Sequence, residues 1–260
     1  MKRIFISALL AILLVLGVSC AFAGETPKEG NWDFNLAPLY LWVVDMEGDI
    51  GIGPVDSEVN VPFSDLFDNL ETVFTVHFEA THRSNWGLFF DYSYLDIGAS
   101  GPGPQGLTTI NIDMASTIVE VGGLYRIENG PHAFDMLGGV RYTKLEPDLT
   151  VTPPPPPPGP ANGKFSLTED WYDPFVGVRY FYDFGNKWML SARGDIGGFG
   201  VGCDFTWNVA ALVHFQPWKN VGFVAGYRAL DQDYEDGSGS SRFKYDMRLS
   251  GPLLGLNFVW

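Results

Sequence analysis

Cysteine, basic residues and long apolar runs are all scarce in this 260-residue chain. Its two cysteines are Cys20 and Cys203, and Cys20 lies in an N-terminal segment that we expect to be removed. A mature chain with one cysteine has no intramolecular disulfide. An exported protein of this size must therefore be held together by other means.

Basic side chains are outnumbered: 16 lysines and arginines stand against 31 acidic residues, and the formal net charge is −15 at pH 7. Removing the N-terminal segment takes away Lys2 and Arg3 and no acid. Binding to nucleic acid needs a basic footprint. The composition therefore excludes nucleic acid as a partner.

The long apolar run is N-terminal, from Ile4 to Val18, and Ala21-Phe22-Ala23 follows it. A positive start, an apolar stretch and small residues at the cleavage position are typical of a secretory signal peptide. We expect residues 1–23 to be the signal peptide and residues 24–260 to be the mature domain.

Two alternatives remain open for the N-terminal segment. A membrane-spanning anchor needs about 20 apolar residues, and this run is short for it. Lipoprotein processing at Cys20 is the other, and the preceding Gly17-Val18-Ser19 fits that signal poorly.

Apolar residues make up 46% of the chain, yet after the signal they are spread in alternation. Alternation predicts strands with one apolar face. We predict ten of them, with boundaries uncertain by a few residues. The segments are Trp32–Val44, Thr72–His82, Trp86–Ile97, Thr108–Arg126, His132–Leu145, Leu167–Phe184, Trp188–Phe199, Cys203–Phe215, Val221–Asp231 and Arg242–Trp260.

The connections between these segments separate a soluble β-sandwich from a transmembrane β-barrel. Four links are tight turns, "RSN", "ENGP", "GNK" and "QPWKN", and they alternate with mostly longer links. Transmembrane barrels have short periplasmic turns and longer outer loops. The pattern predicts an all-β antiparallel transmembrane barrel of about ten strands, with eight or twelve as alternatives, and places both chain ends in the periplasm.

The eight tryptophans also favour a barrel. Trp32, Trp86, Trp188, Trp218 and Trp260 fall at the predicted periplasmic ends, and Trp42, Trp171 and Trp207 fall near the opposite ends. Ten residues of tilted strand climb roughly 25 Å, which is the height of the apolar band between two aromatic girdles. We therefore expect two tryptophan belts.

Two segments are expected to break register, one by a β-bulge near Ala115–Ser116 and one near Gly251-Pro252. Charged residues within the segments then fall on the face opposite the apolar residues. A charge facing lipid costs about 2–4 kcal/mol at the midplane, so we expect these side chains to point into the lumen. They form either a structural ion-pair network, which we favour, or a lining that selects solutes. The expected lumen residues are His77, Glu79, Asp91, Glu120, Arg126, Arg141, Arg179, Arg193, Asp195, Arg228, Asp246 and Arg248.

The residues "WDFNLAPLYLW", "PFSDLFDNL", "HFEA", "WYDPFVGVRY", "RGDIGGFGVG" and "YDMRLSGPLLGLNFVW" resemble a group of poorly characterised Gram-negative outer-membrane β-barrel proteins, the small opacity-type and porin-like barrels. The resemblance covers almost all of the mature chain. It implies insertion into the outer membrane by the barrel-assembly machinery, which reads a last strand ending in an aromatic residue. Leu254, Leu256, Phe258 and Trp260 are then the assembly signal, and the last strand closes against the first. It implies no established activity.

We expect a structural protein or a narrow passive channel for small solutes, in contact with outer-membrane lipid and lipopolysaccharide. An adhesin that acts through its acidic loops and its run of six prolines, residues 153–158, is the alternative. An outer-membrane hydrolase is less favoured, because no histidine lies near an obvious nucleophile or near the outer rim. We expect no catalytic residue, cofactor or metal site, and the sequence leaves the oligomeric state open.

Overall fold

The computed structural model describes residues 30–42, 44–68, 70–102, 109–152 and 163–260. The predicted signal peptide and the proline run lie outside the described residues. Trp32–Trp260 forms one compact unit, and all the strands described belong to it.

The unit is built almost entirely of strands, as the alternation predicted. Its elements in chain order are β1 (Trp32–Trp42), β2 (Asp45–Ile52), β3 (Val55–Val61), α2 (Phe63–Asp68), β4 (Leu70–His82), β5 (Trp86–Pro102), β6 (Thr109–Asn129), β7 (His132–Thr152), β8 (Lys164–Ser166), β9 (Glu169–Gly185), β10 (Trp188–Gly198), β11 (Phe205–Phe215), β12 (Val221–Asp236), η3 (Gly239–Ser241) and β13 (Phe243–Val259).

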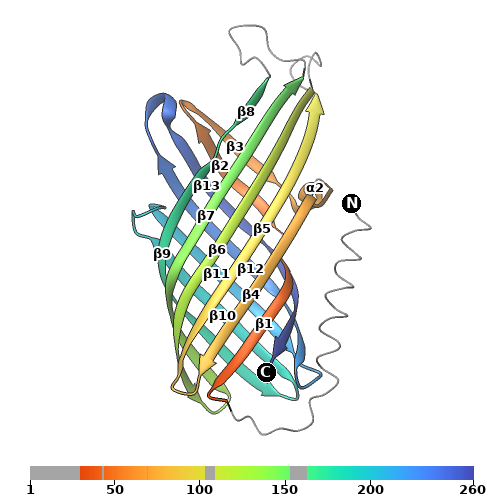
Figure 1. Cartoon of the computed structure of the whole chain (residues 1–260), viewed down its shortest axis with the longest axis vertical. Helices are drawn as coiled ribbons and strands as arrows, with labels where there is room; N and C mark the ends of the chain where they lie inside the picture. The colour runs from red at the N-terminus through yellow and green to blue at the C-terminus, as the bar shows by residue number, and fades with distance from the viewer. Residues whose placement is uncertain (1–29, 43, 69, 103–108, 153–162) are drawn as a thin grey trace. The chain divides into compact units, whose positions relative to one another are not determined.

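Ten strands close into an antiparallel barrel (Figure 1). The order is β1-β4-β5-β6-β7-β9-β10-β11-β12-β13, and β13 pairs back with β1. The closing ladder includes the last residue, because Trp260 and Phe34 exchange backbone hydrogen bonds of 3.0 and 3.2 Å. Closure removes the unpaired edges that lipid cannot satisfy. The predicted ten-stranded barrel is confirmed.

Short strands extend the barrel at the end that carries the longer links. β2 continues the path of β1 and pairs with the outer half of β13, from Phe243 to Ser250, while β1 pairs with its other half from Leu253 onward. Pro252 therefore lies between the part of β13 that pairs with β2 and the part that pairs with β1. Its missing N–H leaves no gap in either of these two ladders. β13 keeps one continuous register with β12 through this point, so the predicted break at Gly251-Pro252 is wrong.

The irregularity in register lies in β1 instead. The β1–β13 pairing shifts by one residue between Leu36 and Leu39, around Pro38. A shift of one residue moves the following side chains to the other face. β6 pairs without interruption with both neighbours, so the bulge predicted at Ala115–Ser116 is also wrong.

The shift in β1 corrects the expected tryptophan belts. Trp42 turns inward, where its indole N–H donates to the Arg228 carbonyl at 3.3 Å. Trp171 is buried as well, stacked on Tyr234 with ring centroids 4.2 Å apart. Two of the three predicted members of the outer tryptophan belt are therefore wrong, while Trp207 stays on the outer face, with Arg248 5.4 Å from its ring centre. The other belt is present, because five tryptophans at the opposite end are 44–62% exposed: Trp32, Trp86, Trp188, Trp218 and Trp260.

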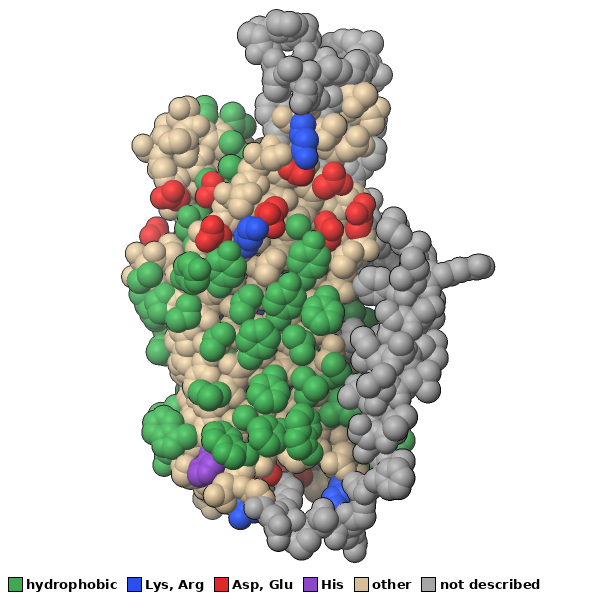
Figure 2. All heavy atoms as spheres, viewed as in Figure 1, with side chains coloured by type: hydrophobic (Ala, Val, Ile, Leu, Met, Phe, Trp, Pro, Cys, Tyr) green, Lys and Arg blue, Asp and Glu red, His purple; other side chains and the backbone are tan. Residues whose placement is uncertain are grey.

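The outer surface of the barrel carries an apolar band. Figure 2 shows hydrophobic side chains covering the middle of one face, with acidic side chains gathered beyond them. Among the exposed apolar residues are Phe74, Leu88, Val121, Val140, Val176, Val209, Phe223 and Leu254. Side chains of this kind are stable where lipid surrounds them. No helix among the described residues is long and apolar enough to cross a membrane.

Candidate functional site

Five charged side chains meet across the middle of the lumen, and we call them the central cluster: Glu120 of β6, Arg141 of β7, Arg193 and Asp195 of β10, and Arg228 of β12. Glu120 accepts hydrogen bonds from all three arginines at 2.8–3.0 Å. Asp195 accepts from two of them at 2.8 Å. Because β6 and β12 stand on opposite sides of the ring, these bonds span the lumen.

Neutral side chains complete the central cluster. Thr206 and Asn208 of β11 bond to Arg141 and Arg228 at 3.3 and 2.9 Å. Aromatic rings cover the guanidinium groups: Arg228 lies 4.6 Å from the ring centre of Trp42, and Arg141 lies 5.2 Å from that of Phe175. Rings placed in this way stabilise cations and exclude water.

A second cluster lies nearer the short turns. Asp135 of β7 accepts hydrogen bonds from Arg126 and Arg179, each with a closest distance of 2.7 Å. Glu79 of β4 also bonds to both arginines, at 3.2 and 2.6 Å. Asp135 is fully buried, and it was not among the expected residues although alternation places it on the same inward face as Leu137 and Arg141.

His77 of β4 lies between Glu79 of the second cluster and Asp91 of β5. Its Nδ1 lies 2.9 Å from Asp91, and its Nε2 lies 3.9 Å from Glu79. The Tyr40 hydroxyl donates to the same Asp91 oxygen at 3.3 Å, and the other oxygen of Asp91 is buried without a hydrogen-bond partner among the described residues.

The ion pairs inside the lumen use five arginines, and five carboxylates face them when Asp91 is included. These are Arg126, Arg141, Arg179, Arg193 and Arg228, with Glu79, Asp91, Glu120, Asp135 and Asp195. Asp173 is a sixth buried carboxylate, and it accepts hydrogen bonds from the Trp171 indole and the Cys203 backbone N–H at 3.1 and 2.7 Å. Among the described residues, the buried carboxylates therefore outnumber these arginines by one. Arg193 and Asp195 of the "RGD" sequence belong to this interior.

Two expected lumen residues lie on the outer face. Asp246 pairs with Lys244 at 3.3 Å and its side chain is 44% exposed. Arg248 pairs with Asp231 at 3.1 Å and is half exposed. The inward positions here are those of Phe243, Tyr245, Met247 and Leu249, which are all buried. The assignment was wrong because it assumed the break at Gly251-Pro252, which the continuous register with β12 rules out.

Apolar side chains fill the lumen beyond the central cluster, toward the longer loops. We call them the outer core. Its buried members are Val44, Met46, Ile118, Leu145, Trp171, Cys203, Leu230, Tyr234, Phe243, Tyr245, Met247 and Leu249. Packed apolar side chains leave no path for water. The outer core and the central cluster together occupy the lumen from its middle toward the loop side.

A cavity of about 480 Å³ occupies the other half of the lumen. It reaches from Arg193 and Arg228 of the central cluster to the turn residues Asn186 and Lys187. Small side chains create this space, since Ala37 and Ala210 line it where larger ones would fill it. Cavities of about 300–1,000 Å³ hold small-molecule ligands.

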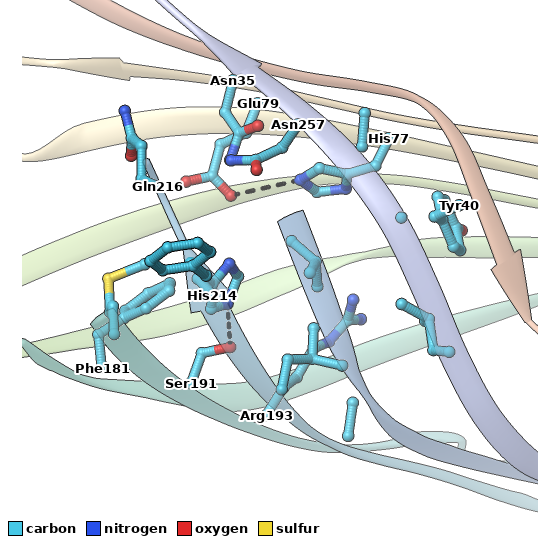
Figure 3. A pocket seen from close by; sticks show the side chains of 18 of the residues that line it. Asn35, Tyr40, His77, Glu79, Phe181, Ser191, Arg193, His214, Gln216 and Asn257 are labelled. Carbon is cyan, nitrogen blue, oxygen red and sulfur yellow. Dashed lines mark hydrogen bonds and ion pairs between the residues drawn. The ribbon is translucent and has the colours of Figure 1, made fainter. Parts of the chain in front are cut away.

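Two polar groups that the sequence did not connect face each other in this cavity. Ser191 of β10 and His214 of β11 lie 2.8 Å apart, Oγ to Nε2 (Figure 3). They occupy diagonal positions on paired strands, because Ser191 pairs with Leu212. Sequence alone does not give the register between two strands, so it carried no signal for this pair.

The Ser191–His214 distance suits a nucleophile and its base, but a serine hydrolase also needs a group that orients the histidine. Within the described part of the chain, no carboxylate hydrogen-bonds to His214. The pair therefore forms a polar patch on the cavity wall. The described residues contain no group of three or more His, Cys, Asp or Glu side chains suited to a metal ion.

The four expected assembly residues share the outer face of β13. Leu254 and Trp260 are 57% and 51% exposed, and Leu256 and Phe258 are half-buried. The ring of Trp260 stacks on Phe34 of β1 with centroids 5.5 Å apart. The end of the chain thus completes both the apolar surface and the closing ladder.

No protein-family model and no curated protein sequence matches the chain. Solved structures do match. The outer-membrane protease OmpT from Escherichia coli has a TM-score of 0.56 at 7% identity, over 91% of this chain and 99% of that one. The translocator domain of autotransporter NalP from Neisseria meningitidis matches with a TM-score of 0.46 at 12% identity, over 99% and 96% of the chains. The attachment invasion locus protein Ail of Yersinia pestis has a TM-score of 0.37 at 13% identity, over 90% and 100%. At these identities the likeness concerns the fold alone, and that fold is the β-barrel of Gram-negative outer-membrane proteins.

Proposed function

We propose that the protein is an outer-membrane barrel that is closed to passage and binds a small molecule in a cavity open to the periplasm. The observation that carries the proposal is the position of the central cluster. Its arginines form the inner end of the cavity, and the opposite end reaches the short turns. Short turns lie on the periplasmic side of such barrels.

A passive channel fits the lumen less well. A conducting pore needs a continuous wet path, and here the central cluster is followed by the outer core. Most of the buried charges are also held in ion pairs with one another. Their role in the proposal is structural, because they join strands from opposite walls and stiffen the barrel without a disulfide.

The proposal is one of binding without catalysis, since the Ser191–His214 pair lacks an orienting carboxylate among the described residues. Outer-membrane lipid covers the apolar band, lipopolysaccharide lies against the outer end, and the barrel-assembly machinery inserts the chain. The adhesin alternative relied on the acidic loops and on the proline run at 153–158, and the proline run lies outside the described residues.

Thiol accessibility tests the proposal. The Leu212→Cys variant, made in a Cys203→Ser background, places a thiol on the cavity wall. The barrel is inserted into lipid vesicles and treated with a charged, membrane-impermeant maleimide. Two control variants establish the orientation: Lys187→Cys marks the turn end, and Ser238→Cys marks the loop end, where both native side chains are exposed.

We expect Leu212→Cys to react whenever Lys187→Cys reacts, and to stay unlabelled when only Ser238→Cys is reached. Planar bilayers containing the native barrel should show no stable conductance steps. Labelling of Leu212→Cys from the loop end, or steady single-channel currents, would show an open lumen and overturn the proposal.

A further inference from the structure

The cavity has an apolar wall and a polar wall. Ala210 and Leu212 of β11, Val224 of β12 and Leu253 of β13 form a continuous aliphatic surface on adjacent strands. In Figure 3 the side chains of Asn35, Glu79 and Asn257 lie together, and Ser191 with His214 lies across from them. A ligand that fits both walls must have one apolar side and one polar side.

The ionised groups within the cavity already have partners. Glu79 is bound by two arginines, and Arg193 and Arg228 are bound by Glu120. Burying another charge beside such pairs would leave it uncompensated, which is costly. At the rim, the oppositely charged Asp183 and Lys187 are exposed to water. The site therefore favours an uncharged ligand.

Hydrogen-bond acceptors are left over on the polar wall. Asn257 is 7% exposed, and its Oδ1 has no partner among the described residues. The same is true of one oxygen of Asp91, which is 8% exposed, and of the Asn35 Oδ1. All three residues line the cavity. The three oxygens are themselves buried, so a ligand meets the polar side chains that carry them and not these atoms directly.

We infer that the cavity binds an uncharged amphiphile, whose alkyl part packs on the aliphatic wall and whose hydroxyl groups hydrogen-bond with the polar lining residues Asn35 and Asn257. The inference rests on the proposed function and names its ligand class. The volume of about 480 Å³ suits a short alkyl chain with a sugar-sized head group. The glycoside class of compound combines these two parts.

Three probes with one six-carbon tail test the inference: hexyl glucoside, hexyl sulfate and hexyltrimethylammonium. Each is titrated calorimetrically into the barrel held in lipid nanodiscs. Ala210→Phe fills the cavity, and Ala211→Phe is its matched control, because Ala211 is the next residue on β11 and faces outward. Heat that remains with Ala210→Phe measures partition into lipid.

We expect saturable binding of hexyl glucoside to the native barrel and to Ala211→Phe, and its loss in Ala210→Phe. Asn257→Leu should bind the glucoside about three- to tenfold more weakly, as expected when one net hydrogen bond is lost. The charged probes should show only the partition heat.

Tighter binding of either charged probe, abolished by Ala210→Phe, would overturn the ligand class and leave the proposed binding cavity intact. If no probe distinguishes the native barrel from Ala210→Phe, the inference also fails. The proposed function is then decided by thiol accessibility and conductance, which need no ligand.

Discussion

Replacing Glu120 by glutamine tests whether the lumen is closed. Glu120 is 1% exposed and accepts hydrogen bonds from three arginines. The substitution keeps the shape of the side chain and removes its charge. Three guanidinium groups then face Asp195 as the remaining carboxylate of the central cluster.

The size of the effect follows from burial. Removing one partner from a buried ion pair costs about 3–5 kcal/mol, because the remaining charge stays buried and uncompensated. We expect Glu120→Gln to lower the free energy of unfolding by this amount. Adding Arg228→Met removes one of the three guanidinium groups that Glu120→Gln leaves facing Asp195, so the double variant should be more stable than Glu120→Gln alone.

The assay is reversible urea unfolding of the barrel in phosphatidylcholine vesicles, followed by tryptophan fluorescence. Arg248→Ala is the matched control, since it removes an arginine from an ion pair on the outer face. Arg248 is half exposed, and exposed pairs contribute at most about 1 kcal/mol. A loss below about 1 kcal/mol for Glu120→Gln would mean that water solvates the central cluster, and closure of the lumen would be refuted.

Three further predictions concern the ends of the barrel. Deleting Trp260 removes its backbone bonds to Phe34, so less of the chain should insert, as measured by the fraction whose electrophoretic mobility shifts on boiling; normal insertion would show that the ending is incidental. Where β2 and β3 extend the barrel, hydrogen bonds from Arg242 lower the pKa of Asp56 and of Glu235. The ionised carboxylates therefore stabilise this extension above their unfolded pKa values, which lie near 4. The stabilisation disappears as the pH falls through the lowered pKa values. A spin label at Ser57 should therefore become mobile in acid, and at neutral pH in Arg242→Ala; equal mobility in all three conditions would contradict this. Burial raises the pKa of the Cys203 thiol, so maleimide should label this thiol only after the barrel unfolds. Fast labelling of the folded barrel would show that the outer core is not packed as described.

Strand number and most side-chain directions were predictable because a strand repeats every two residues. In β10, for example, alternation alone placed Arg193 and Asp195 inside. The failures came where two residues disturb that period. Pro38 accompanies a real shift of register in β1, which turned Trp42 inward. Pro252 accompanies none, and assuming one sent Asp246 and Arg248 to the wrong face.

The two prolines look alike in sequence, and their difference lies in the neighbouring strands. Pro252 lies in β13 between the residues that pair with β2 and those that pair with β1, so its backbone does not need to donate a hydrogen bond to either strand. This change of partner along β13 depends on the β2–β3 hairpin, which forms in a segment that the sequence pattern predicted to be a loop. Ion pairs across the lumen could not be predicted from the sequence either, because they also depend on which strands come together. Glu120 and Arg228, for example, are 108 positions apart.

The filling of the lumen explains why the two ends of the barrel differ. On the loop side, aromatic and aliphatic residues such as Trp171 and Tyr245 pack inward and leave only a small cavity of about 40 Å³. On the turn side, Ala37, Ala210 and Gly255 occupy inward positions, and the volume they leave becomes the cavity. A barrel needing only rigidity would gain stability from filling both halves, since apolar side chains packed in the lumen are removed from water. The retained space on one side, lined by aliphatic and polar side chains, is therefore the feature that favours a binding role over a purely structural one.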